Sequence, residues 1–308
     1  MQNKRTVSSD SRNVPHTTYR IQFHKDFNFV DFQAIIPYLR ELGIDTVYAS
    51  PILQAKAGSL HGYDSTDMNQ LNSELATIED LRRIKKLLDE YNIKWLQDIV
   101  PNHMAFHTTN AWLMNLLEFG KASTYSDFFD TCYSSNLFEK GKLMVPFLGK
   151  TVNEAIGCSE LKVVHFNGRL WLSCHGQSYP LRPESYCFIL DDHLHATHED
   201  FNGLLVQINT IQANGDHVGW DGLRMGLLDG LSDKGINDIL KIFNDDFEGL
   251  QTLVDSQYYE LCPWWESNKR INFRRFFTVN ELICMNVQDP QVFAQTHSLI
   301  QKLVSEGL

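Results

Sequence analysis

The sequence has no long hydrophobic run. The segment from Met1 to Val14 is polar and has no apolar core of the kind found in a signal peptide. No apolar stretch approaches the roughly 20 residues that a membrane-spanning helix needs. We therefore expect a soluble, cytoplasmic protein with no membrane partner.

The cysteines lack any motif spacing. None of the six belongs to a C-x-x-C pair, so the sequence predicts no zinc or redox centre. Irregularly spaced cysteines in a chain of 308 residues favour reduced thiols in the cytoplasm. No cofactor is expected. The cysteines are Cys132, Cys158, Cys174, Cys187, Cys262 and Cys284.

Positive charge is also scarce. The chain has 27 Lys and Arg against 38 Asp and Glu, a formal net charge of −11. Nucleic acids and anionic membranes are bound through clustered Lys and Arg, so this balance argues against nucleic acid as a partner. Aromatic residues make up 12% of the chain, a content that favours neutral, hydroxyl-rich ligands.

The first hundred residues carry an alternating pattern. Residues 18–23 and 44–49 read as strands, Asp31 opens an amphipathic run that Gly43 closes, and a polar loop extends from Ser50-Pro51 to about Ser73. Thr77 caps a second helix, and residues 93–100 form a third strand. This β-α-β-α-β order predicts an α/β fold with parallel strands joined by right-handed crossovers.

The alternation stops after His103, and the pattern is mixed to about Pro290. We expect a mainly helical region, with a hairpin that turns at Asn167-Gly168 and a final helix that starts at Pro290. The further expected elements are a helix over 111–121, hairpin strands within 161–173, and helices over 227–243 and 247–261.

A cluster of polar side chains follows the third strand. The apolar run ends at Asp98, and Asn102 and His103 come in the loop after it. Sites in parallel α/β folds lie beyond the carboxyl ends of the strands, and carboxylate, amide and imidazole groups bind sugar hydroxyls. The alternative is that Asp98 only caps a turn and that His103 is an ordinary surface histidine.

A second cluster follows the second strand, at His61-Gly62-Tyr63-Asp64. The Tyr63 ring could offer a flat face to a sugar, while Asp64 accepts hydrogen bonds from its hydroxyls. The competing interpretation of Tyr63 is a packed loop aromatic.

Taken together, the motifs resemble the maltooligosyl trehalose synthase branch of the α-amylase family of glycoside hydrolases. The resemblance runs from about Thr17 to Leu308. The motifs are Thr18-Tyr19-Arg20-Ile21-Gln22, Tyr48-Ala49-Ser50-Pro51, Gly58-Ser59, His61-Gly62-Tyr63-Asp64, Asp98-Ile99-Val100-Pro101-Asn102-His103-Met104, Leu143–Gly149, Tyr179-Pro180-Leu181 and Ile271–Phe277 followed by Val279-Asn280.

The resemblance implies part of a (β/α)₈ TIM barrel. Residues 1–16 would be a flexible lead, 17–103 the first three β/α units, and 104–289 a large insertion after the third strand. Residues 290–308 would be the third barrel helix, with the chain ending before the fourth strand. Three strands of an eight-stranded barrel leave inner faces and one edge exposed, so a separate C-terminal half with strands four to eight is an expected partner.

The reaction implied by the resemblance belongs to trehalose biosynthesis. It moves the terminal α-1,4 bond of a maltooligosaccharide to an α,α-1,1 bond with retained configuration, which needs a carboxylate nucleophile and a carboxylic acid. Asp98 and His103 would lie beside the sugar at the cleavage point. The expected substrate-binding residues are His61, Tyr63, Asp64, Asp98, Asn102, His103 and Arg275.

The catalytic carboxylates of the family are expected beyond residue 308, so no catalytic residue is predicted here and the chain is expected to be inactive alone. Residues 221–231 resemble the nucleophile strand, but they precede Arg274-Arg275 instead of following it, and their apolar spacing is helical. A hydrolase built on Asp64 and Asp98 is a less favoured reading.

Two interpretations of function stay open. The chain is the N-terminal part of a glucosyl-transferring enzyme, or it is a non-catalytic α-glucan-binding or relic protein. The family tends to carry charged residues where Thr278, Asn286 and Gln288 stand, and this difference puts substrate binding in question. The carbonyl of Asn102 matches a calcium ligand of many amylases, but no carboxylate cluster accompanies it and no metal is predicted.

Overall fold

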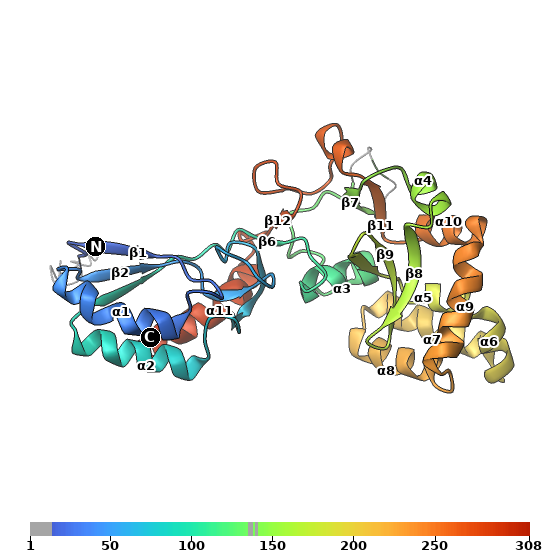
Figure 1. Cartoon of the computed structure of the whole chain (residues 1–308). Helices are drawn as coiled ribbons and strands as arrows, with labels where there is room; N and C mark the ends of the chain where they lie inside the picture. Colours follow the sequence, from blue (N-terminus) through green and yellow to red (C-terminus); the bar gives the residue numbers. More distant parts are fainter. Residues whose placement is uncertain (1–13, 135–137, 139–140) are drawn as a thin grey trace, which may run out of the picture. The chain divides into compact units, whose positions relative to one another are not determined.

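The computed structural model describes residues 14–134, 138 and 141–308. Most of the predicted lead, residues 1–13, lies outside the described residues. Two compact units make up the chain (Figure 1). Unit 1 comprises Met1–Val100 with His297–Leu308, and unit 2 comprises Pro101–Thr296.

Unit 1 is built on a three-stranded parallel sheet in the order β1-β2-β5, which confirms the predicted parallel strands. The strands are β1 (Thr18–Ile21), β2 (Thr46–Ala49) and β5 (Lys94–Gln97). The register pairs Arg20 with Tyr48 and Tyr48 with Leu96. These three side chains therefore share one face of the sheet, since neighbours in register point the same way.

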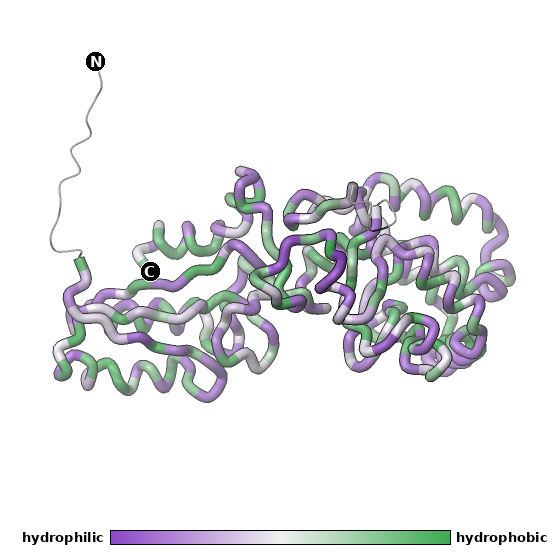
Figure 2. The backbone as a smooth tube through the Cα atoms, turned by 90° about the horizontal axis from the view of Figure 1, so that it is seen from above, coloured by the Kyte–Doolittle hydropathy of each residue, from purple (hydrophilic) through white to green (hydrophobic). Residues whose placement is uncertain are grey.

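Two amphipathic helices cover the other face (Figure 1). Helix α1 spans Phe29–Glu41 and α2 spans Ile78–Glu90. Thr77 caps α2 as predicted, with Asp80 completing a capping box. The cap of α1 is Asn28, three residues before the predicted opener Asp31, which instead closes that capping box. Figure 2 shows hydrophilic and hydrophobic residues alternating along the chain.

The core of unit 1 is an aromatic cluster between the sheet and its helices. Phe23, Phe29 and Phe32 are at most 2% exposed, and each has its ring centroid within 6.0 Å of that of Trp95. Helix α11 (Pro290–Ser305) begins in unit 2, and its later turns belong to unit 1 and bring Leu303 into this core. On the opposite face, Leu96 stays 45% exposed.

The stretch from Ser50 to Ser73 is not the plain loop that its composition predicted. It contains an antiparallel pair, β3 (Leu53–Ala55) and β4 (Ser65–Leu71), with two register irregularities. The polar residues of β4 hid the strand, because alternation of hydrophobic and polar side chains is weak there. The His61–Asp64 motif lies in the connection between these strands.

Two strands near the two ends of unit 2 pair with each other and form a two-stranded ribbon. Strand β6 (His103–Ala105) runs antiparallel to β12 (Leu282–Cys284). Strand β7 (Leu143–Leu148) runs parallel to β11 (Tyr259–Pro263). The predicted hairpin at Asn167-Gly168 is confirmed as β8 (Leu161–Phe166) and β9 (Arg169–Cys174), and β10 (Gln177–Pro180) pairs with β9.

Helices fill most of the rest of unit 2. The predicted helix over 111–121 is confirmed as α3 (Ala111–Phe119), which continues as the 3-10 turn η2 (Gly120–Ala122). Further helical segments are α4 (Val152–Gly157), α5 (Glu184–Ile189), α6 (Asp191–Thr197), α7 (Phe201–Asn214), α8 (His217–Leu228), α9 (Asp233–Asp245), α10 (Phe247–Asp255) and the 3-10 turn η3 (Trp264–Asn268).

Two predicted helices of unit 2 are wrong in their extent. The one over 227–243 is broken between α8 and α9, because Gly230 has a φ of +82° and Ser232 caps a new helix. The one over 247–261 ends at Asp255, and the chain then enters β11. Residues 221–228 are helical. This confirms the helix that their apolar spacing predicted, despite their resemblance to the nucleophile strand.

No helix in the described part of the chain is long and apolar enough to cross a membrane.

Replacing Phe32 by alanine should lower the free energy of unfolding of unit 1 by about 3–5 kcal/mol, because the ring is fully buried against Trp95. Urea denaturation followed by tryptophan fluorescence measures the change. Val30→Ala on the same helix is the matched control, since Val30 is 69% exposed and should change stability by no more than about 0.5 kcal/mol. Equal losses for both variants would contradict the packing described for α1.

Candidate functional site

One oxygen of Asp98 collects three hydrogen bonds at the carboxyl end of the unit 1 sheet. Oδ2 accepts from Arg20 Nη1 at 3.0 Å, from the Tyr63 hydroxyl at 2.6 Å and from the Tyr48 hydroxyl at 3.3 Å. Arg20 Nη2 also donates to the Tyr63 oxygen at 2.8 Å, and its guanidinium lies 4.1 Å from the centre of the Tyr48 ring. Four side chains from separate segments thus hold one another in place.

This cluster is partly exposed to solvent. The Asp98 side chain is 15% exposed and that of Arg20 is 32% exposed. Asp98 Oδ1 accepts no hydrogen bond from the described residues, so it is an acceptor open to a ligand hydroxyl. Burial, followed by the hydrogen bond to Asp98, raises the pKa of Tyr63. The phenol therefore stays protonated and keeps donating to the carboxylate at neutral pH.

A tight loop presents Tyr63 to Asp98. Gly62 has a φ of +74°, and a Cβ at this position would lie 2.7 Å from the carbonyl oxygen of Pro51. Only glycine fits both the conformation and the close approach. The Ser59 hydroxyl donates to Asp64 Oδ1 at 2.5 Å and accepts from the Gly62 amide at 3.1 Å.

His61 lies on the outer side of the same loop. Its Nδ1 accepts a hydrogen bond from the Tyr63 amide at 3.0 Å and is 3.7 Å from Asp64 Oδ1. The His61 side chain is 52% exposed, whereas that of Asp64 is 16% exposed. Asp64 therefore stabilises the loop, and His61 and Tyr63 are the side chains that the loop presents.

The other predicted contact residues lie in unit 2. His103 is 1% exposed, stacks on Phe276 with ring centroids 4.4 Å apart, and begins β6 instead of lying in a loop. Its Nδ1 is 3.0 Å from Asn102 Oδ1. The alternative of an ordinary surface histidine is therefore wrong, because the ring packs inside unit 2.

Arg275 is held by its neighbours in unit 2. Its Nη1 donates to the Ser267 hydroxyl at 3.1 Å and to the Asn280 side-chain oxygen, and Nη2 donates to the Ser267 carbonyl at 3.2 Å. The guanidinium thus fixes the turn after β11 relative to the segment that ends at Asn280. These bonds make Arg275 a residue that organises the surface beside it.

That surface forms a pocket of about 420 Å³ in unit 2. Phe277 is 81% exposed with a φ of +53°, and its ring packs edge-on against Phe276. Arg274 pairs with Asp130 at 3.5 Å. The lining residues are Asn102, Asp130, Arg274, Arg275, Phe276, Phe277, Cys284, Met285, Asn286, Val287 and Gln288.

The structure gives no support for a metal centre in the residues it describes. No three His, Cys, Asp or Glu side chains of that part of the chain lie together as a possible metal site. The Asn102 carbonyl, which matches a calcium ligand of many amylases, accepts a hydrogen bond from the Met285 amide at 2.9 Å.

Within each unit, the structure brings some of the predicted site residues together. Tyr63 contacts Asp98, His61 lies against Asp64, and Asn102 lies against His103. Sequence reasoning missed Arg20, Tyr48 and the exposed Phe277, although all three stand inside motifs that were recognised. The register of β1 and β2 would have identified Arg20 and Tyr48, since it pairs them on the same face of the sheet.

Replacing Tyr63 by phenylalanine should lower the free energy of unfolding by on the order of 1–2 kcal/mol, the low range for a hydrogen bond to a charged group at a half-exposed site. The hydroxyl lost is the one that joins Arg20 to Asp98. Chemical denaturation measures the change. Tyr38→Phe on α1 is the control, because Tyr38 is 56% exposed. A loss no larger than that of the control would count against the Asp98 cluster as described.

Comparison with known proteins finds similarity to one enzyme family. Residues 30–182 match the catalytic domain of α-amylase. A Mycobacterium tuberculosis protein assigned as a maltooligosyl trehalose synthase is 25% identical over 299 residues, which cover 95% of this chain and 30% of that protein. The chain thus spans about 30% of the length of the curated relatives it matches.

Solved structures agree. The maltooligosyltrehalose synthase from Arthrobacter ramosus superposes with a TM-score of 0.67 and 27% identity, over 95% of this chain and 30% of that one. A glycosyltrehalose synthase superposes with a TM-score of 0.65 and 29% identity, over 93% and 32%. The chain has the fold of an α-amylase catalytic domain and is similar, over almost its whole length, to the N-terminal part of maltooligosyl trehalose synthases.

Proposed function

We propose that these 308 residues supply the glucan-gripping side of a catalytic domain that converts the terminal α-1,4 bond of a maltooligosaccharide to an α,α-1,1 bond, in cytoplasmic trehalose biosynthesis. The observation that carries the proposal is the Asp98 cluster. Its carboxylate is fixed by Arg20, Tyr48 and Tyr63 and keeps Oδ1 open. A preorganised acceptor of this kind binds a sugar hydroxyl with little loss of side-chain freedom.

The unit 1 sheet supports an assignment as the first three strands of a (β/α)₈ barrel. Its strands are parallel, and helices cover only one face. The other face leaves Leu96 45% exposed, and further strands would bury this face in a closed barrel. Residues 104–289 would then be the insertion after the third strand, and a separate polypeptide with strands four to eight would be the partner.

The roles of the predicted contact residues follow from their exposure. We assign Tyr63, Asp98 and His61 to direct sugar contact, because all three combine solvent access with a fixed position. Asn102 would contact the substrate from the pocket that Phe277 lines, with the exposed ring as a stacking surface. His103, Arg275 and Asp64 would act by holding these side chains.

The chemistry of the reaction needs two more carboxyl groups. Retention requires a nucleophile and an acid roughly 5–5.5 Å apart. Asp98 is committed to three donors through one oxygen, and Asp64 is bonded to Ser59, so both suit a binding or structural role better than attack on a sugar. The nucleophile and the acid would come from the segment that carries the remaining strands.

Replacing Asp98 by asparagine should weaken binding of maltohexaose at least tenfold, because the amide cannot accept from Arg20 and the sugar as the carboxylate does. Isothermal titration calorimetry on the whole chain measures the affinity. Asp89→Asn on α2 is the matched control, since its side chain is 62% exposed and forms a surface pair with Lys85. Failure of the unaltered chain to bind maltohexaose at millimolar concentration would reject the gripping role.

The chain alone should consume no reducing ends of maltopentaose. Co-expression with the part of the mycobacterial relative that follows the matched segment should produce that activity, and Asp98→Asn should reduce it at least tenfold. A reducing-end assay measures both. Robust conversion by the chain alone would refute the assignment of the carboxylates to another segment, and binding without restored activity would favour the non-catalytic α-glucan-binding protein.

A further inference from the structure

We propose that unit 2 carries a second saccharide site, in a pocket of about 410 Å³ whose residues differ from those of the Phe277 pocket. This volume falls within the roughly 300–1,000 Å³ of ordinary ligand pockets. The pocket lies among α3, β9 and α8. Its lining combines hydroxyl, amide, carboxylate, guanidinium and aromatic groups. Naming an α-glucan as its ligand rests on the proposed function.

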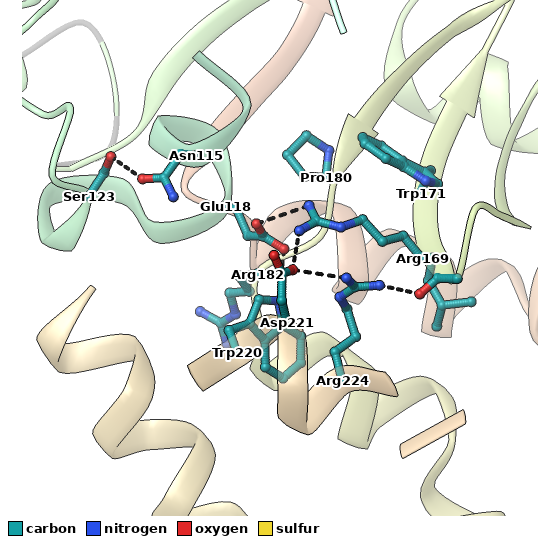
Figure 3. Close-up of polar contacts among 12 residues, drawn as sticks. Asn115, Glu118, Ser123, Arg169, Trp171, Pro180, Arg182, Trp220, Asp221 and Arg224 are labelled. Atoms are coloured by element: carbon teal, nitrogen blue, oxygen red, sulfur yellow. Dashed lines mark hydrogen bonds and ion pairs between the residues drawn. The ribbon is translucent and has the colours of Figure 1, made fainter. Parts of the chain in front are cut away.

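A partly buried ion network lines this pocket (Figure 3). The Glu118 side chain is 5% exposed, and its two oxygens accept from Arg169 Nη1 at 3.3 Å and from Trp220 Nε1 at 2.8 Å. Asp221 Oδ1 pairs with Arg169 and, at 2.9 Å, with Arg224. Since each partner is held from two sides, Arg169 and Asp221 have fixed orientations.

The network leaves polar atoms turned toward the pocket. Asp221 is 47% exposed, and its Oδ2 accepts no hydrogen bond from the described residues. The side-chain oxygen of Asn115 accepts from the Ser123 hydroxyl at 2.6 Å, which leaves the amide nitrogen as a donor (Figure 3). Thr108 and His217 add further polar groups to the wall.

Aromatic rings complete the wall. Trp171 and Tyr125 both line the pocket. Tyr125 is fixed by stacking on Trp112, with ring centroids 5.6 Å apart and an angle of 16° between the planes. Apolar ring surface beside fixed donors and acceptors is the arrangement that binds the alternating apolar and hydroxyl faces of a sugar.

The charge balance selects a neutral ligand. Two arginines and two carboxylates neutralise one another within the network, and the whole chain carries a net charge of −11. A phosphate or nucleic acid would need surplus positive charge, which these side chains do not provide. A role limited to fastening α3, β9 and α8 together explains Glu118 but not the polar groups of Thr108, Asn115 and His217 in the wall.

Blocking the pocket without disturbing its ion network tests the proposal. Ala111 is exposed, lines the pocket and belongs to the first turn of α3, so Ala111→Trp fills the pocket and leaves the ion network intact. Ala196→Trp is the matched control, because Ala196 is exposed on α6 and is not among the lining residues. Thermal unfolding of both variants verifies that they fold as the unaltered chain does.

The readout is hydrogen–deuterium exchange of the whole chain titrated with maltohexaose. We expect saturable protection of peptides covering 108–125 and 217–225 in the unaltered chain and in Ala196→Trp. Ala111→Trp should raise the midpoint for these peptides at least tenfold and leave that for peptides covering 58–64 and 95–100 unchanged.

The other outcomes separate the two proposals. Protection of peptides 58–64 and 95–100 alone would overturn the second site and leave the proposed function standing. Protection confined to 108–125 and 217–225 would support the second site and count against the gripping role of Asp98. Protection of the pocket peptides by inorganic phosphate in place of maltohexaose would identify an anion site and overturn the saccharide assignment.

Discussion

A single carboxylate oxygen holds together the candidate site at the carboxyl end of the unit 1 sheet. Asp98 Oδ2 joins β1 through Arg20, β2 through Tyr48 and the β3–β4 connection through Tyr63. The arrangement requires parallel strands in register, because only then do their carboxyl ends meet at one edge. It also requires Gly62, whose left-handed backbone brings Tyr63 within reach. The position of the oxygen Oδ1 therefore depends on both the sheet and the loop.

Much of unit 1 and its site could be predicted from sequence because the signals are local. Apolar spacing and the Thr77 cap marked α2, and the apolar runs marked the strands. The Tyr63 and Asp98 motifs were both recognised, but their contact depends on the connection between β3 and β4, a strand pair that the sequence did not predict. Arg20 joined the cluster only through register, which no local pattern gives.

Several features of unit 2 depend on residues far apart in the chain, and local sequence patterns do not predict them. Strand β11 pairs with β7, more than a hundred residues earlier in the chain, so the end of α10 is set by a distant partner. The burial of His103 likewise depends on Phe276, which lies more than 170 residues later in unit 2. The break between α8 and α9 had a visible cause in Gly230 and Ser232, and apolar spacing alone concealed it.

The ribbon of β6 and β12 has a consequence for how this fold tolerates change. The backbone bond from Phe106 to the Glu281 carbonyl continues the pairing, so the chain leaves and returns through adjacent strands. Closing such a loop costs entropy that grows only with the logarithm of its length, about 0.6 kcal/mol for each doubling. Segments between these strands can thus be lengthened, shortened or exchanged at low thermodynamic cost. The paired strands β6 and β12 would keep the two ends of such a segment together while its binding surfaces change.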